Sequence, residues 1–472
     1  MLPPEVEYVK KQIINHLMLF FERDVLNLFY SGFIRFLPYD EAIAVNDRTV
    51  VIPFDIPMPF EIGHPFNVGF NGTNLTLWNR IPPPDGGFWK GIPNEAAPLW
   101  YQNPGGTLIP AWNLFGNLFQ LLTFGEERAT SKRDAHGRYA AVFSPRSLLN
   151  LIEVPAFNEA VAALVGAADG LRRNAEPSYE LERLIRPAII VLSHDCDILR
   201  GNDFWTQSVR LLRIFQPLLK ARLPKIGNAW WMVRNAFTPR RFYFDNVTGM
   251  IDLERCFGFK STFYLLNGSG GRFGARSGSA IMPDVLANIP DDWNIGMHYN
   301  YDTFLNEECF SAQLAQLQEI AESEITTGRA HYLKFDPERS FPFLCKHGIN
   351  VDESSGYADR IGYRNGIGGC FQVFNPEICA PLDIWEVPMV VMDAVLVRQY
   401  GDKAVNKFSE LVSHLSRIGG ALTLIFHPGQ FFNPEYGQML GIYHKILIAC
   451  RQSGIRSRTA RSLVDEIRSN SA

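Results

Sequence analysis

The 472-residue sequence contains no Cys-x-x-Cys pair, and its seven cysteines are an odd number. An odd number of cysteines does not suit a disulfide framework, and the absence of Cys-x-x-Cys pairs argues against a zinc site built from thiolates. Free thiols are typical of a reducing compartment. The sequence therefore predicts free cysteines.

A sustained run of basic residues is also missing. The net charge is −4 and the pI is about 6.2, whereas proteins that bind nucleic acid gather Lys and Arg on one surface. The short basic stretch Arg451–Arg461 is predicted to be the solvated face of a C-terminal helix. A nucleic-acid partner is therefore not expected.

Long apolar runs are absent too: no window approaches the roughly 18 uncharged apolar residues that a membrane span needs. The N-terminus, MLPPEVEYVKKQIINHL, has an early acidic residue and apolar positions spaced by three and four. This spacing predicts an amphipathic helix and not a signal peptide. We therefore expect a cytoplasmic protein without a membrane span.

The length predicts two domains. Proline and glycine are dense in the first 110 residues, which predicts short strands and irregular loops. Two helices are then expected, at 112–127 and 155–173. We place the boundary in the polar stretch Arg172–Arg186, which gives a smaller α+β domain at 1–180 and a second domain at 187–472.

The second domain has an α/β pattern. Short apolar runs of the buried-strand type alternate with helical stretches such as 306–325 and 402–418, which predicts parallel strands with crossover connections. About six strands in some 280 residues suit a barrel. The predicted strands are Ile189–Leu192, Ser261–Leu266, Trp293–Met297, Tyr332–Phe335, Ile384–Met392 and Ala421–Phe426.

Acidic and histidine side chains lie at the ends of four of these strands. Asp195 and Asp197 follow the first, His298 follows the third, His331 precedes the fourth and His427 follows the last. The carboxyl ends of parallel barrel strands face one mouth. Three such ligands suit Zn²⁺ or a similar divalent ion and leave a position for water. A further carboxylate and histidine could act as base and acid.

Several motifs, in order, resemble the polysaccharide deacetylase family, carbohydrate esterase family 4. The resemblance covers about Pro187 to Ile448. After the strand-end Asp pair it rests on the segments Glu254–Tyr264 (ERCFGFKSTFY), Gly296-Met297-His298, Gly362-Tyr363-Arg364-Asn365-Gly366 and Leu424-Ile425-Phe426-His427. It implies a distorted, incomplete (β/α) barrel.

By the same resemblance, Asp195 would be the general base and His427 the general acid, while Asp197 and His298 would hold the metal. Arg364 would orient Asp195.

The family's second histidine, four residues after the first, is replaced here by Asp302. The third metal ligand is therefore either Asp302 or His331, with a slight preference for His331.

The segment 117–147 resembles an uncharacterised domain that precedes divergent deacetylases. Its polar residues could form a site of their own, but a turn and salt-bridge cluster supporting the domain interface is favoured. These residues are Glu126, Glu127, Asp134, His136 and Arg138. The loop Gly268–Ser279 is expected at the barrel rim, where Arg272 or Arg276 could contact an anionic sugar.

The expected function is metal-dependent removal of an acetyl group from an N- or O-acetylated sugar, an intracellular polysaccharide precursor. Two alternatives stay open. One is a catalytically silent barrel that binds carbohydrate or a partner, and the other is an amide hydrolase acting on a non-sugar compound.

Overall fold

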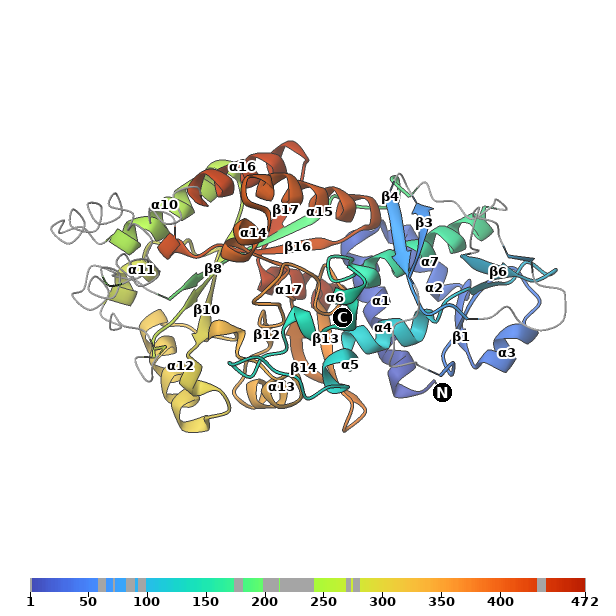
Figure 1. Ribbon diagram of the computed structural model, residues 1–472, viewed down its shortest axis with the longest axis horizontal. Coiled ribbons are helices and arrows are strands. Elements are labelled where there is room, and N and C mark those ends of the chain that lie inside the picture. The colour runs from blue at the N-terminus through green and yellow to red at the C-terminus, as the bar shows by residue number, and fades with distance from the viewer. Residues whose placement is uncertain are drawn as a thin grey trace, which may run out of the picture.

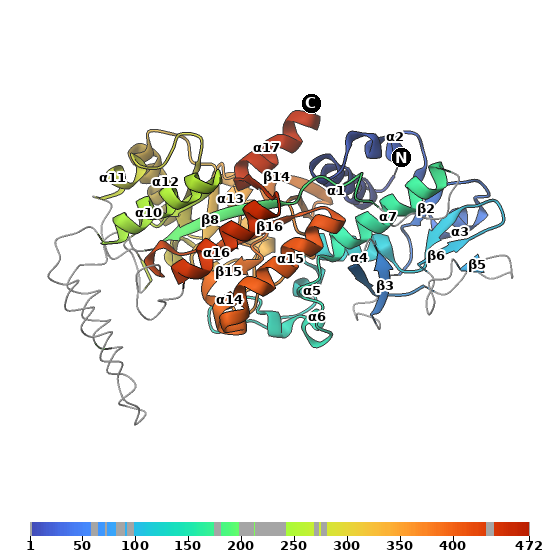
Figure 2. The same ribbon diagram turned by 90° about the horizontal axis from the view of Figure 1, so that it is seen from above.

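The computed structural model describes residues 2–57, 65–70, 73–81, 90–91, 99–173, 181–197, 212, 242–268, 273–274, 281–430 and 439–471. The N-terminal elements lie at one end of the long axis and a (β/α) barrel lies at the other (Figure 1, Figure 2). Among the described residues, none of the helices combines the length and the apolar character needed to cross a bilayer.

The barrel is built on a ten-stranded sheet with the order β13-β14-β12-β11-β10-β9-β8-β16-β15, and β17 pairs with β8. All of these pairings are parallel except β13 with β14. The two ends of this order, β13 and β15, do not pair with each other in the described part of the chain, so the barrel is open between them. The predicted α/β class and the distorted, incomplete barrel are confirmed.

Crossover helices connect the parallel strands, as Figure 1 shows. The strands are β8 (Ile189–Cys196), β9 (Ser261–Leu265), β10 (Asn294–Tyr299), β11 (Thr327–Ala330), β12 (Val351–Asp352), β13 (Phe371–Asn375), β14 (Ala380–Glu386), β15 (Val391–Met392), β16 (Ala421–Ile425) and β17 (Arg456–Arg458). The helices are α10 (Phe242–Phe257), α11 (Met282–Leu286), α12 (Glu307–Ala321), α13 (Pro337–Lys346), α14 (Asp393–Tyr400), α15 (Ala404–Ile418), α16 (Met439–Gln452) and α17 (Ala460–Ser471).

One strand prediction is wrong and bears on the site. The strand expected at Tyr332–Phe335 is instead β11, and a 3-10 turn at His331–Leu333 follows it. The backbone turns because Tyr332 and Leu333 both have left-handed φ values, 60° and 50°, which no strand can contain. His331 therefore stands at the carboxyl end of a strand.

The N-terminal part forms a mixed five-stranded sheet, in the order β1-β2-β7-β6-β5, and a separate β3-β4 hairpin. The strands are β1 (Ile34–Leu37), β2 (Val50–Pro53), β3 (Phe66–Phe70), β4 (Thr73–Leu77), β5 (Lys90–Gly91), β6 (Trp100–Gln102) and β7 (Leu108–Pro110). The helices are α1 (Pro4–Phe20), α2 (Asn27–Tyr30), α3 (Tyr39–Ala44), α4 (Leu114–Leu122), α5 (Gly125–Arg128), α6 (Pro145–Leu148) and α7 (Ala156–Arg172). The helix expected at 112–127 breaks at Phe124, whose φ is 57°.

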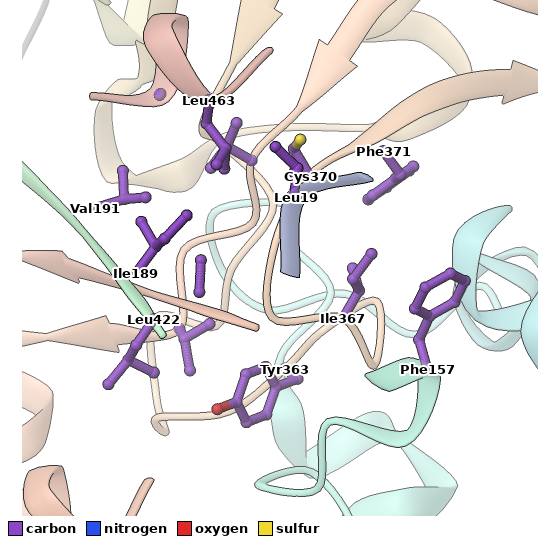
Figure 3. Close-up of a cluster of buried hydrophobic side chains, with 14 of the residues drawn as sticks. Leu19, Phe157, Ile189, Val191, Tyr363, Ile367, Cys370, Phe371, Leu422 and Leu463 are labelled. Carbon is purple, nitrogen blue, oxygen red and sulfur yellow. The ribbon is translucent and has the colours of Figure 1, made fainter. Parts of the chain in front are cut away.

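One buried apolar cluster joins the two parts of the chain. Leu19 of α1 and Phe157 of α7 belong to the same cluster as Ile189 of β8, Leu422 of β16 and Leu463 of α17 (Figure 3). Part of the predicted boundary, residues 174–180, lies outside the described residues. The division into domains 1–180 and 187–472 stays a prediction, and the core is continuous across it.

Candidate active site

Neighbouring strands carry the candidate site to one end of the barrel. Ser193 and Asp195 lie in β8, Asp197 follows its last residue, and side chains alternate along a strand, so the three share one face. His298 lies near the end of β10 and pairs in register with Arg329 of β11. His427 comes two residues after β16. The sheet thus brings together five of the predicted site residues, Asp195, Asp197, His298, His331 and His427.

Asp197, His298 and His331 form a group whose ligand atoms all lie within 4.8 Å of one another. Nε2 of His298 is 3.1 Å from Oδ1 of Asp197, and Nε2 of His331 is 3.7 Å from the same oxygen. Asp302 is not a member of this group. It lies beyond the end of β10 in a 3-10 turn (Tyr301–Thr303).

The protonation pattern of the three side chains suits a divalent cation. Nδ1 of His298 lies 3.0 Å from the carbonyl of Arg329. A carbonyl only accepts, so Nδ1 carries the proton in the neutral ring and Nε2 presents a lone pair. This lone pair faces Oδ1 of Asp197, which is buried without a hydrogen-bond partner. Two acceptors at 3.1 Å repel each other unless a cation or proton lies between them.

The surroundings of His331 and Asp197 favour the protonation states in which these side chains bind a metal ion. Burial lowers the pKa of His331 to about 4, so its ring is neutral at pH 7. Burial alone would raise the pKa of Asp197, but the contact with His298 and the nearby charge of His427 outweigh burial and hold this pKa below its ordinary value. A neutral imidazole and an ionised carboxylate are the forms that bind metal. The Asp197–His298–His331 group is therefore positioned to bind a metal ion.

Asp195 lies beside this group and is held by Arg329. Nη1 of Arg329 donates to Oδ1 of Asp195 at 2.5 Å, and its Nη2 donates to Ser193 at 2.6 Å and to Glu353. Burial alone would raise the pKa of Asp195, but the charge of Arg329, with that of His427, keeps it below its ordinary value. Oδ2 of Asp195 is 3.8 Å from His298 and 3.9 Å from His427. Asp195 is thus ionised, and its second oxygen faces the two histidines.

Arg364 does not take the position that the family resemblance gave it. It donates to Glu127 of the N-terminal part at 2.5 Å and to the carbonyl of Gly356, while Arg329 contacts Asp195. The neighbouring Asn365 donates to the carbonyl of Leu121. The segment that resembled the family's arginine motif therefore attaches the N-terminal part to the barrel.

His427 is charged because of a second carboxylate. Its Nδ1 is 3.0 Å from Oδ1 of Asp393, and its backbone N–H donates to the same carboxylate. Burial by itself would lower the pKa of His427, but Asp393, with Asp197 and Asp195, raises it to about 10. The protonated Nε2 lies on the Asp195 side of the ring.

Sequence reasoning gave no role to Arg329, Glu353 or Asp393. The strand-end rule could have found Asp393, because it directly follows β15. An arginine inside the buried strand β11 also needs a buried partner. His194 also has a structural role, because its ring nitrogens face the carbonyl of Phe426 and the carboxylate of Glu254.

The polar residues of segment 117–147 hold the two parts of the chain together. Arg146, which Glu126 holds at 2.7 Å, donates to the carbonyls of Tyr363 and Arg364. Arg138, paired with Asp134, reaches the carbonyl of Tyr332 in the barrel. Of the predicted rim loop 268–279, positions 272 and 276 lie outside the described residues.

Comparison with known proteins gives matches among solved structures alone. No family model matches the chain, and no curated protein matches it. A candidate polysaccharide deacetylase from Mycobacterium smegmatis aligns at 14% identity and a TM-score of 0.38, over 61% of this chain and 92% of that one.

Two further solved structures are similar at comparable levels. A chitin deacetylase from the fungus Colletotrichum lindemuthianum aligns at 12% identity and a TM-score of 0.31, over 60% of this chain and 88% of that one. The PuuE allantoinase aligns at 12% identity and a TM-score of 0.37, over 60% and 89%.

Proposed function

We propose that the chain is a metal-dependent hydrolase that removes an acetyl group from an N- or O-acetylated sugar. The observation that carries this proposal is the position of Asp195, paired with Arg329, beside His427, paired with Asp393, next to three side chains suited to a divalent ion. An ionised carboxylate and a protonated imidazole, 3.9 Å apart, are the base and the acid that acyl-group hydrolysis needs. The sugar substrate, a polysaccharide precursor, follows from the family resemblance of the motifs.

Asp197, His298 and His331 would hold the ion. Two imidazoles and one carboxylate match the ligand set of catalytic zinc sites, so Zn²⁺ is the first choice. When bound, such an ion polarises a carbonyl oxygen and lowers the pKa of water to about 7.

Asp195 accepts the proton of the attacking water through Oδ2, while Arg329 fixes its other oxygen. As the bond between the acetyl carbon and the leaving nitrogen or oxygen breaks, His427 gives the proton of Nε2 to the leaving atom. Asp393 holds the ring of His427 in place through Nδ1. The products are acetate and the sugar with a free amine or hydroxyl, and the atoms and protons balance.

Acetate release tests this proposal. The zinc-loaded protein is incubated with acetylated sugars, among them a β-1,4-linked tetramer of N-acetylglucosamine and an O-acetylated xylose oligomer, and acetate is measured enzymatically. We expect release by the parent and a loss of at least a hundredfold in Asp195→Asn and in His427→Gln. Release from an N-acetylated amino acid but from no sugar would make the protein an amide hydrolase of another substrate class. No release from any acetyl compound would contradict the hydrolase proposal.

A further inference from the structure

Four aromatic rings gather next to the metal-ligand group, and one of them comes from the N-terminal part of the chain. They are His136, Phe273, Tyr301 and Tyr332. The ring of Tyr332 lies 4.7 Å from that of His331, 4.7 Å from that of Phe273 and 5.3 Å from that of His136, measured between centroids. We call these four residues the aromatic cluster.

The aromatic cluster is not part of a hydrophobic core. His136, Phe273 and Tyr301 are half-buried, and Tyr332 keeps 40% of its surface exposed. Packing alone would bury such rings, because each large aromatic side chain covers much apolar surface when it is buried. Cationic groups stand at the edges: Nζ of Lys334 lies 3.8 Å from the centre of the Tyr301 ring, and Arg138 adjoins Tyr332.

Tyr332 is also held in a strained conformation. Its φ of 60° and ψ of 11° lie in the left-handed region, which is unfavourable for a residue with a Cβ atom. The carbonyl of this residue accepts a hydrogen bond from Nη1 of Arg138 at 2.6 Å. Asp134 fixes Arg138 in turn, through Nε at 2.8 Å. A strained residue that the surroundings hold in place beside a site indicates a functional constraint.

We propose that the aromatic cluster binds a pyranose ring of the substrate, and that the N-terminal segment 134–138 is therefore part of the substrate site. This inference rests on the proposed function, since it takes the substrate to be a sugar. One face of a pyranose consists of C–H groups and its rim of hydroxyls. The exposed ring of Tyr332 suits the apolar face, while the tyrosine hydroxyls, Arg138 and Lys334 suit the rim.

The contact between Tyr332 and the metal ligand His331 determines which sugar unit of the substrate the aromatic cluster binds. A ring on Tyr332 is next to the place where the acetyl group must lie, so the cluster takes the sugar that carries the acetyl group or its immediate neighbour in a chain. Glu126 and Glu127 help to hold segment 134–138 at this place, because they attach the N-terminal part to the barrel through Arg146 and Arg364. The substrate site is thus incomplete without the N-terminal part.

The test is binding of the N-acetylglucosamine tetramer, measured by calorimetry on the full chain in EDTA, so that no hydrolysis consumes the probe. Tyr332→Ala is expected to weaken binding at least tenfold and His136→Ala severalfold, while Tyr332→Phe, which keeps the ring and loses only the hydroxyl, should weaken binding much less than Tyr332→Ala. Tyr30→Ala is the matched control, because Tyr30 is 70% exposed on α2 and should not affect binding. A parent that does not bind the tetramer, or a Tyr332→Ala variant that binds it equally well, overturns the proposal.

Acetate release from ethyl acetate, which carries the acetyl group without a ring, separates this proposal from the proposed function. The loss of kcat/KM in Tyr332→Ala should be at least tenfold larger on the tetramer than on the ester. An equal loss on both would mean that Tyr332 acts only by holding His331, and would overturn the sugar-binding role. A parent that binds the tetramer but releases no acetate from either compound would contradict the hydrolase proposal and leave the binding surface standing.

Discussion

Replacing Arg329 by Met removes a cation that lies between two buried carboxylates, Asp195 and Glu353. The side chains of Arg329 and Glu353 are fully buried, and that of Asp195 is 5% exposed. Removing one partner of a buried ion pair costs about 3–5 kcal/mol, because the remaining charge is left without compensation. We expect Arg329→Met to lower the free energy of unfolding by about this amount at neutral pH.

The pH dependence of this loss follows from the carboxyl groups. In the parent, Arg329 keeps the pKa of Asp195 below its ordinary value. The ionised Asp195 therefore stabilises the folded state at pH values above its unfolded-state pKa, and this stabilisation is lost as the pH falls through the folded-state pKa. Without Arg329, burial dominates and raises the pKa above the unfolded value. The variant then loses stability as the pH rises through the folded-state pKa. The difference between parent and variant should therefore be larger at pH 8 than at pH 5.

Urea unfolding at pH 5 and pH 8, followed by tryptophan fluorescence, measures this effect. Arg364→Met is a matched control, because Arg364 is an equally buried arginine paired with Glu127. It should also destabilise the protein, but the pH profile of acetate release should change in Arg329→Met alone. The double variant Arg329→Met/Glu353→Gln should lose less than the sum of the two single variants. A loss under about 1 kcal/mol in Arg329→Met at pH 8 would refute the buried-charge reasoning, because it falls well below the cost of breaking such a pair.

Two further predictions concern histidines. Asp393→Asn removes the carboxylate that raises the pKa of His427 to about 10, so the alkaline limb of acetate release should move to lower pH, and an unchanged limb would show that Asp393 does not control this proton. Burial lowers the pKa of His16 in α1 from 6.5 to about 3, so the folded state disfavours the protonated ring, and stability is lost as the pH falls below 6.5. Between pH 7 and pH 5 this amounts to about 2 kcal/mol. Urea unfolding at pH 7 and pH 5 should show a smaller loss of stability in His16→Phe than in the parent. The same dependence of stability on pH in both proteins would contradict the lowered pKa of His16.

The sequence predicted those parts of the site that follow from strand periodicity. Asp195 and Asp197 share a face because the chain stays extended through Cys196. His298 and His427 lie at strand ends, as expected from the apolar runs before them. The predicted strand at 332–335 was wrong because two consecutive left-handed residues interrupt it. Neither is a glycine, so the sequence carries no signal for the turn.

The roles of the two arginines could not be predicted from the sequence. Both Arg329 and Arg364 are buried beside carboxylates, and only tertiary structure decides which carboxylate each one meets. The resemblance to a family motif pointed to Arg364, whose position is explained by its attachment to the N-terminal part. The aromatic cluster joins residues from distant segments, and no local pattern connects His136 with Tyr332.

Metal content is the most direct test of the central claim that Asp197, His298 and His331 form a metal site. The purified protein is dialysed against Zn²⁺ and then against buffer, and zinc per chain is measured by mass spectrometry. We predict one ion per chain in the parent and in Asp302→Asn, and none in Asp197→Ala, His298→Ala or His331→Ala. A parent without stoichiometric metal, or a loss in Asp302→Asn equal to that in His331→Ala, would contradict the account.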